Sequence, residues 1–343
     1  MIPPALLNLL ACPVTGTSLT IEGESLVSEA GTRYPVINGV PVLLPPDASK
    51  DTLECIRASR EASQNGTAGG LFVDALGCND EERRGILKLA AEGSSKVDPV
   101  VNYLIAATAG NMYKHLIGRL REYPIPSFRE KHGAGRVLVD LGCNWGRWCV
   151  AAGREGFQPL GIDPQLGALM AARRVTQQLG INAWFVCADA RHLPLRRESI
   201  DFGFSYSVLQ HLSHEDVGLV LAGLAKALKP GAESLIQMPT RAGLKGMLHR
   251  ARHGFRPPQG FDVRYWSLRQ LEEVFGRAIG PTGFSVDCFF GIGLQAADAR
   301  LMPLPFRAAL TASEALRHLS HAVPPVTWLA DSVYVHSRKP VIS

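Results

Sequence analysis

Three absences limit what this 343-residue chain can be. No apolar run reaches the roughly 18 residues of a bilayer-spanning helix, so no transmembrane helix is predicted. No basic region precedes the short apolar run at the N-terminus, so a secretory signal is not expected. The seven cysteines are scattered without any C-x-x-C pair. Such an odd, dispersed set is typical of reduced thiols, which predicts a cytoplasmic protein.

The chain is long and apolar enough to bury a substantial core. Hydrophobic residues make up 46% of it, which suits one large domain with an appendage. No internal repeat or low-complexity tract interrupts it. The composition therefore predicts a globular protein and leaves its chemistry to local motifs.

The most informative motif is VLVDLGCNWG, residues 137–146. An apolar run ends in Asp140, and Gly142 and Gly146 follow four residues apart; a second apolar run then ends in Asp163. This order of strand, glycine turn, helix, strand and carboxylate indicates the opening of a doubly wound α/β nucleotide-binding domain. Glycine allows the sharp turn and the close approach of a ligand or helix.

The glycine turn distinguishes between two kinds of cofactor. Dinucleotide sites have G-x-G-x-x-G, whereas this turn reads D-x-G-x-x-x-G. An acid at that place repels phosphate but suits the ammonium and sulfonium groups of S-adenosylmethionine. The segment resembles motif I of the class I S-adenosylmethionine-dependent methyltransferases, in particular the small-molecule, ubiquinone- and menaquinone-type branch. An ordinary βα turn with two glycines is the alternative.

Later segments follow the order of that family over roughly residues 100–340. A third strand is expected at 185–188, a fourth from 201, a fifth at 234–239, and two last strands at 284–290 and 332–337. A helix is expected at 267–275, with Ser267 as its N-cap and a nearby Glu completing a capping box. The resemblance implies an α/β fold: a doubly wound, seven-stranded, mostly parallel, Rossmann-like sheet. A small β-rich module is expected at the N-terminus on separate grounds, from a second resemblance confined to that segment.

The resemblance further implies which residues hold the cofactor. In the family, an acid in the position of Asp163 binds the ribose, and one in the position of Asp189 takes the adenine amino group. Helices ahead of the first strand often cover the cofactor, so Asn111, Tyr113 and His115 are lid candidates, with buried helix residues as the alternative. The predicted cofactor-binding residues are Asp140, Gly142, Cys143, Asn144, Trp145, Gly146, Asp163, Pro164, Asp189, Ala190, Ser205 and Tyr113. Cys143 and Cys149 are better explained as small core residues than as redox groups.

The N-terminal segment is distinct from the rest. Residues 9–19 and 33–45 resemble the small zinc-ribbon module that partners tRNA, rRNA and protein methyltransferases. Cys12 is retained, but Thr15 stands where a second cysteine is expected, and residues 28–31 contain none. Structural zinc needs four ligands, so no metal is predicted. The expected domains are a degenerate ribbon at 1–46, a helical connector and lid at 47–130, and the methyltransferase domain at 131–343. Within the connector, apolar periodicity predicts helices at 51–62 and 80–91.

A basic insertion is expected at about residues 240–264, and a helical one at about 292–328. Six arginines and lysines lie between Arg241 and Arg264 against one acid, Asp262, with apolar residues at helical spacing. We predict that acceptor-binding residues lie in and just after this insertion: Arg250, Arg252, Arg256, Tyr265 and Trp266. An anionic acceptor, peripheral contact with an anionic membrane, and a solvated face over apolar packing remain open. No larger basic field accompanies it, which disfavours nucleic acid.

Methyl transfer from a sulfonium is an in-line displacement, so the protein mainly positions the acceptor and excludes water. An oxygen or amine acceptor can need a base, and His211 follows the fourth strand where the resembled family places its acceptor. Tyr206 and Gln210 would orient that acceptor. The alternative for His211 is a helix-start residue bonded to the backbone.

The sequence thus predicts methyl transfer to a small-molecule or lipid-linked acceptor, at oxygen rather than carbon. RNA or protein methylation is one alternative, although the N/D-P-P-Y signature of amino-methylating enzymes is absent. A non-catalytic cofactor-binding subunit is another, against which Asp140, Asp163 and Asp189 are all retained. The oligomeric state stays open.

Overall fold

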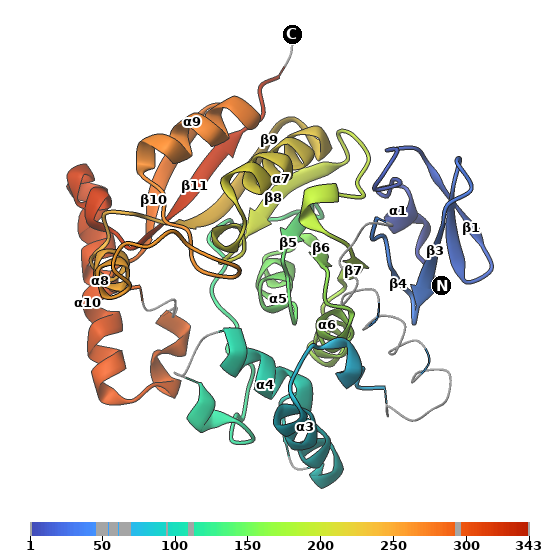
Figure 1. Cartoon of the computed structure of the whole chain (residues 1–343), viewed down its shortest axis with the longest axis horizontal. Coiled ribbons are helices and arrows are strands. Elements are labelled where there is room, and N and C mark those ends of the chain that lie inside the picture. Colours follow the sequence, from blue (N-terminus) through green and yellow to red (C-terminus); the bar gives the residue numbers. More distant parts are fainter. Residues whose placement is uncertain are drawn as a thin grey trace. The chain divides into compact units, whose positions relative to one another are not determined.

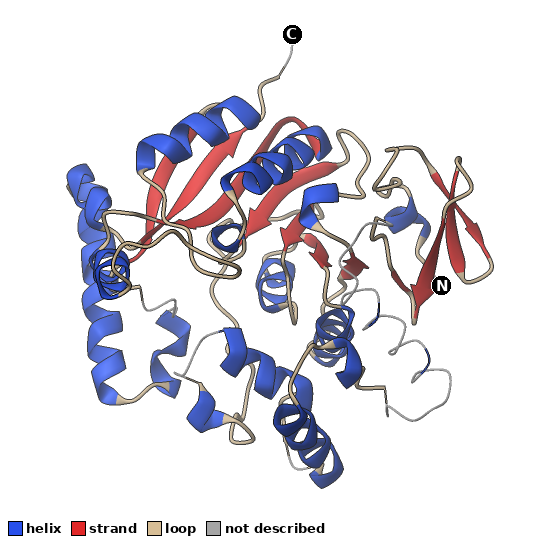
Figure 2. Cartoon of the chain, in the orientation of Figure 1, coloured by secondary structure: helices blue, strands red, loops and turns tan. Residues whose placement is uncertain are grey.

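The computed structural model describes residues 2–45, 54, 61, 70–93, 95–108, 113–291 and 296–341. The chain forms two compact units, residues 1–196 and 197–343, and Figures 1 and 2 show their elements. Asn111, most of the connector helix expected at 51–62 and the start of the helical insertion lie outside the described residues. Within the described part, no helix is long and apolar enough to cross a bilayer.

The main sheet has seven strands in the order β10-β11-β9-β8-β5-β6-β7. The pairs β5–β6, β6–β7 and β8–β9 are parallel, while β11 pairs antiparallel with both β9 and β10. This arrangement confirms the predicted α/β class with a mostly parallel seven-stranded sheet. The nearly continuous apolar strand sequences follow from burial on both faces, as in other parallel sheets.

The first unit contains a small antiparallel sheet, a helical segment and three strands of the main sheet. Its strands are β1 (Leu19–Glu22), β2 (Ser25–Ser28), β3 (Arg33–Ile37), β4 (Val40–Pro41), β5 (Val137–Leu141), β6 (Gln158–Asp163) and β7 (Trp184–Cys187). Its helices are α1 (Pro4–Leu7), α3 (Asp80–Glu92), α4 (Pro99–Thr108), α5 (Arg147–Arg154) and α6 (Leu166–Gln178), with short 3₁₀ turns η1 (Val73–Ala75), η3 (Lys114–Leu116) and η4 (Ala190–His192).

The second unit contains the other four strands of the main sheet and the segments where the two insertions were expected. Its strands are β8 (Ile200–Ser205), β9 (Leu228–Pro239), β10 (Thr282–Cys288) and β11 (Ser332–Arg338). Its helices are α7 (His214–Ala227), α8 (Leu244–Arg252), α9 (Leu268–Ala278) and α10 (Leu304–Ala322), with 3₁₀ turns η5 (Leu209–His211), η6 (Ala296–Leu301) and η7 (Pro324–Leu329).

Local signals explain where two helices begin. Asn79 caps α3 in a reciprocal capping box with Glu82. Ser267 caps α9 as expected, but the residue that completes its capping box is Gln270, so the expectation of a Glu there was wrong. The amide of Gln270 lies at the third helical position, where its oxygen accepts from the Ser267 backbone N–H.

The N-terminal segment forms the four-stranded antiparallel sheet β1-β2-β3-β4, which packs within the first unit. Val42 forms a parallel bridge to Cys187, and the Leu43 amide donates to the Cys187 carbonyl over 2.8 Å. The Cys12 Sγ contacts the Tyr34 hydroxyl at 3.2 Å. Among the described residues, no group of His, Cys, Asp and Glu side chains is suited to hold a metal. Kinship with the zinc ribbon stays a prediction, as does the absence of zinc.

Candidate cofactor and acceptor sites

The glycine turn after β5 has the conformation that its residues require. Gly142 and Gly146 adopt φ values of 74° and 77°, in the left-handed region that glycine tolerates. Gly146 also directly precedes α5, and a Cβ built on it would lie 3.1 Å from the Ala172 Cβ of α6. Any side chain there would therefore press against α6. The turn is tied to the next strand by the Gly142 amide, which donates to the Ile162 carbonyl over 2.7 Å.

Asp163 ends β6 with its carboxylate held in place. One oxygen accepts from the Asn144 backbone N–H at 3.0 Å and the other from the Gln165 N–H at 2.8 Å. Burial raises the pKa of Asp163 to about 6, against the lowering effect of those two backbone hydrogen bonds. The carboxylate thus braces the glycine turn from the end of the neighbouring strand.

Asp140 is buried beneath the turn. Its side chain accepts a weak hydrogen bond from the Cys149 thiol at 3.4 Å. Burial is the main cause that raises the pKa of Asp140 to about 7; the Cys149 bond opposes it, and the charge of Asp163 adds to it. Burial also raises the pKa of Cys149, to about 11. Both Cys143 and Cys149 lie in the core of the first unit, which supports their interpretation as core residues.

The remaining predicted cofactor residues occupy varied environments. Trp145 and Tyr113 are buried. The Trp145 ring packs against the Tyr123 ring, with 6.0 Å between their centroids. Pro164 is exposed and Ala190 is half-buried where η4 begins, whereas Ser205 ends β8 in the second unit and is buried.

Asp189 follows β7 and is already paired. Its carboxylate accepts from the Arg191 guanidinium, with the shortest contact at 2.6 Å. Burial raises the pKa of Asp189, but the hydrogen bonds and charge of Arg191 outweigh burial and lower it overall. An adenine amino group at this position would share the carboxylate with Arg191.

In the second unit, the turn after β8 fixes the tautomer of His211. Its Nδ1 lies 2.8 Å from the Phe261 carbonyl oxygen, which can only accept, so Nδ1 carries the proton. Its Nε2 lies 3.1 Å from the Gln210 amide nitrogen, which donates to it. Burial lowers the pKa of His211, the charge of Arg264 lowers it further, and the bond to Phe261 opposes both. At neutral pH Nε2 is therefore unprotonated, and it accepts the hydrogen bond from Gln210.

Tyr206 is held by residues that the sequence did not single out. Its hydroxyl donates to Asp287 Oδ2 at 3.2 Å, and the same oxygen accepts from the Ser332 hydroxyl at 2.7 Å. Gln237 accepts from the Ser207 backbone N–H at 2.9 Å in the same turn. The sequence did contain a signal for Asp287, because it is a single acid inside the otherwise apolar strand sequence FSVDCFF.

The predicted acceptor residues divide into two groups. Arg250, Arg256 and Tyr265 line a cavity in the second unit, and Arg252 is not among its lining residues. Trp266 is buried and packs against His214, with the two rings tilted by 32° and their centroids 3.9 Å apart. The geometry therefore brings three of the five predicted residues together.

Comparison with known proteins supports the interpretation of the central segment. Residues 138–231 match a family model described as a methyltransferase domain. A Ubiquinone biosynthesis O-methyltransferase of Nitrobacter winogradskyi is 33% identical over 98 residues, which are 29% of this chain and 36% of that protein. The Biotin biosynthesis bifunctional protein BioHC of Cellvibrio japonicus is 33% identical over 99 residues, 29% of this chain and 19% of that protein. The matched part thus spans about a third or less of these relatives.

Among solved structures, one of a SAM-dependent methyltransferase from Methanosarcina mazei superposes with a TM-score of 0.43 at 16% sequence identity. The superposition covers 61% of this chain and 94% of the other chain. The sequence match at 138–231 includes the glycine turn and the ends of β6, β7 and β8. Residues 138–231 are therefore similar to a methyltransferase domain, and the residues of the first unit fit S-adenosylmethionine as the cofactor.

Proposed function

We propose that this protein transfers a methyl group from S-adenosylmethionine to an oxygen of a small-molecule or lipid-linked acceptor. The observation that carries the proposal is the glycine turn between two buried carboxylates, Asp140 and Asp163. Such a turn suits a cofactor with cationic groups and a ribose, and it disfavours a pyrophosphate. The domain match over residues 138–231 and the relatives' names support methyl transfer.

One group of residues would bind the cofactor, and a second group would bind the acceptor and remove its proton. Bound S-adenosylmethionine supplies an electrophilic methyl group on a good leaving group. Asp163 would bind the ribose hydroxyls, and Asp140 would favour the cofactor's positive charge. Once the acceptor displaces the Gln210 hydrogen bond, Nε2 of His211 would take the proton of the acceptor hydroxyl. Tyr206, fixed by Asp287, would orient the acceptor.

A transfer assay with labelled cofactor tests the proposal. Wild-type protein incubated with methyl-labelled S-adenosylmethionine and a cell extract should give a labelled small-molecule or organic-soluble product. Asp163→Ala should lower cofactor affinity about ten- to a hundredfold in calorimetry, since a lost charge-assisted hydrogen bond costs about 1.5–3 kcal/mol. Glu155→Gln, a surface acid of the same unit, serves as the control. Label that appears only in RNA or protein, or unchanged affinity of Asp163→Ala, would refute the proposal.

Cofactor affinity should also depend on pH in a defined direction. Because the pKa values of Asp140 and Asp163 are raised to about 7 and about 6, both acids are partly protonated in mildly acidic solution. A cationic cofactor favours their ionised forms, so binding should release protons and strengthen from about pH 5.5 to about pH 7.5. Asp140→Asn should flatten the profile. S-adenosylhomocysteine, which lacks the sulfonium charge, should show a weaker dependence, and equal slopes for the two ligands would contradict this assignment.

A further inference from the structure

The second unit contains a cavity of about 580 Å³ with a strongly basic lining. The lining residues come from the segment after β9, from α8, from the segment that follows α8 and from the start of α7. Figure 1 labels these helices and strands. Its charged and titratable side chains are four arginines and three histidines against a single carboxylate, that of Asp262. A cavity with this excess of cations attracts a multiply charged anion.

Two arginines of the cavity differ in how they are used. Arg264 has a structural role, because its guanidinium donates to the backbone carbonyls of His211 at 2.8 Å, Asp262 at 3.0 Å and Gly260 at 3.2 Å. Arg250 is only partly engaged. One of its terminal nitrogens donates to the Arg241 carbonyl at 3.1 Å, while its buried Nε has no hydrogen-bond partner in the described structure. A buried N–H without an acceptor is rare in native proteins, and an oxygen of a ligand or of an ordered water would satisfy it.

The histidines add donors that can gain charge. His249 and His253 lie one helical turn apart, with ring centroids separated by 4.5 Å. Burial and then His253 lower the pKa of His249; Lys245 and Arg256 act in the same direction, and Asp262 opposes them. An anion placed beside His249 would favour its protonated, donating form.

The single acid of the cavity is committed to its own loop. Asp262 accepts from the Gln259 backbone N–H at 3.0 Å, and that bond is the largest cause of its lowered pKa. The carboxylate therefore stays ionised and holds the loop, and it offsets only one of the surrounding cations. Arg256 lines the cavity and its charge acts on Asp262, but its guanidinium makes no hydrogen bond to the described residues.

We propose that this cavity binds the phosphate group of a phosphorylated ligand. The inference rests on the proposed function in taking that ligand to be the methyl acceptor. A phosphate dianion suits several arginine forks and histidine donors better than a carboxylate, because it offers more oxygens and more charge. The cavity exceeds the size of a phosphate alone, so it also has room for an attached organic group.

The phosphate could come from a soluble monoester or from a lipid headgroup. Large apolar side chains on and near α8 are exposed, namely Leu244, Met247, Leu248, Phe255 and Phe261. Apolar side chains around a basic cavity are compatible with a lipid-borne phosphate. Both sources offer the same chemistry to the cavity, and the experiment separates them.

The test measures binding directly and without methyl transfer. Calorimetry with inorganic phosphate and with phenyl phosphate covers the soluble source. Sedimentation with phosphatidylcholine vesicles, with and without phosphatidic acid, covers the lipid source. Arg250→Gln and, separately, Arg256→Gln should each weaken binding by about tenfold or more, because each loses a charge-assisted contact. Arg277→Gln on α9, an exposed arginine outside the cavity, is the matched control.

The outcomes separate this proposal from the proposed function. Binding of phenyl phosphate that both cavity variants weaken supports a soluble phosphorylated ligand, and the same pattern with phosphatidic acid vesicles alone supports a lipid. Phosphate binding that is undetectable in both assays would overturn the proposal, as would equal weakening by Arg277→Gln. S-adenosylmethionine affinity is measured on the same samples; if it is intact while phosphate binding is absent, the cavity proposal alone has failed.

Discussion

Replacing His211 by Asn is expected to lower turnover by about 10²- to 10⁴-fold and to leave S-adenosylmethionine affinity unchanged. The structure supplies the reason for that variant. Asn places its amide nitrogen near the position of Nδ1, so it can still donate to the Phe261 carbonyl and hold the loop. It has no nitrogen that could take up the acceptor's proton. A purely structural role for His211 would therefore tolerate this change, whereas a base would not.

The pH profile gives a second measurement of the same role. The pKa of His211 is lowered from 6.5, so the wild-type kcat should rise with pH through a value below 6.5 and then level off. His211→Asn should lose that acidic limb. His318→Gln, which changes an exposed histidine of α10, should leave both rate and profile intact. A turnover of His211→Asn within about threefold of wild type would exclude general-base catalysis by this residue.

Elements whose causes are local in the sequence were predictable. The apolar runs ending in Asp140 and Asp163 became β5 and β6, and the spacing of Gly142 and Gly146 became a turn with two left-handed glycines. The helix expected at 80–91 is α3, at Asp80–Glu92. The spacing of apolar residues, the glycines and the helix caps each act over a few positions. The sequence alone therefore contains the full signal for these elements.

Contacts between residues far apart in the sequence could not be predicted from such local signals. The partner of His211 is the carbonyl of Phe261, 50 positions later, and the partner of Tyr206 is Asp287, 81 positions later. A backbone carbonyl has no side-chain identity to recognise, and an acid within a strand does not reveal which hydroxyl it will meet. The unpartnered Nε of Arg250 likewise depends on burial that only the folded chain defines.

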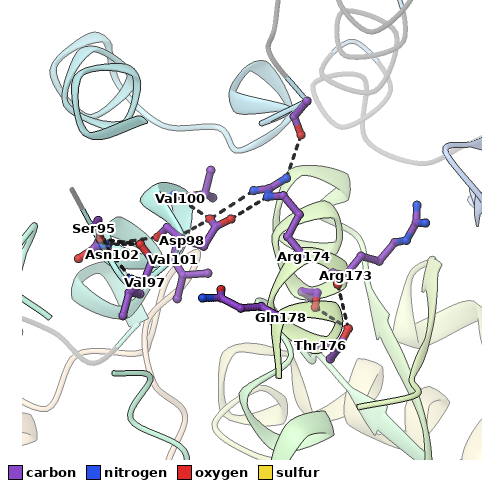
Figure 3. Close-up of polar contacts among 12 residues, drawn as sticks. Ser95, Val97, Asp98, Val100, Val101, Asn102, Arg173, Arg174, Thr176 and Gln178 are labelled. Atoms are coloured by element: carbon purple, nitrogen blue, oxygen red, sulfur yellow. Dashed lines mark hydrogen bonds and ion pairs between the residues drawn. The ribbon is translucent and has the colours of Figure 1, made fainter. Parts of the chain in front are cut away.

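The same limit applies to the ion pair between Asp98 and Arg174, which joins the predicted lid region to α6 in the first unit (Figure 3). Two guanidinium nitrogens of Arg174 donate to the Asp98 carboxylate, at 2.7 Å and 3.3 Å. The Asp98 side chain is only 6% exposed. It also begins α4 by accepting from the Val100 and Val101 backbone N–H groups at 2.9 Å and 3.2 Å. Asp98 thus serves as helix cap and ion-pair partner together.

Arg174→Gln should therefore lower the free energy of unfolding by about 3 kcal/mol, more than a hundredfold in the folding equilibrium, because it leaves a buried carboxylate without its cation. Urea denaturation at neutral pH measures the change. Arg173→Gln alters the neighbouring arginine of α6, which has no such partner among the described side chains, and should cost far less. Adding Asp98→Asn to Arg174→Gln should recover part of the loss, since the uncompensated charge is then gone. If Arg174→Gln costs no more than Arg173→Gln, the pair does not anchor α4 to α6.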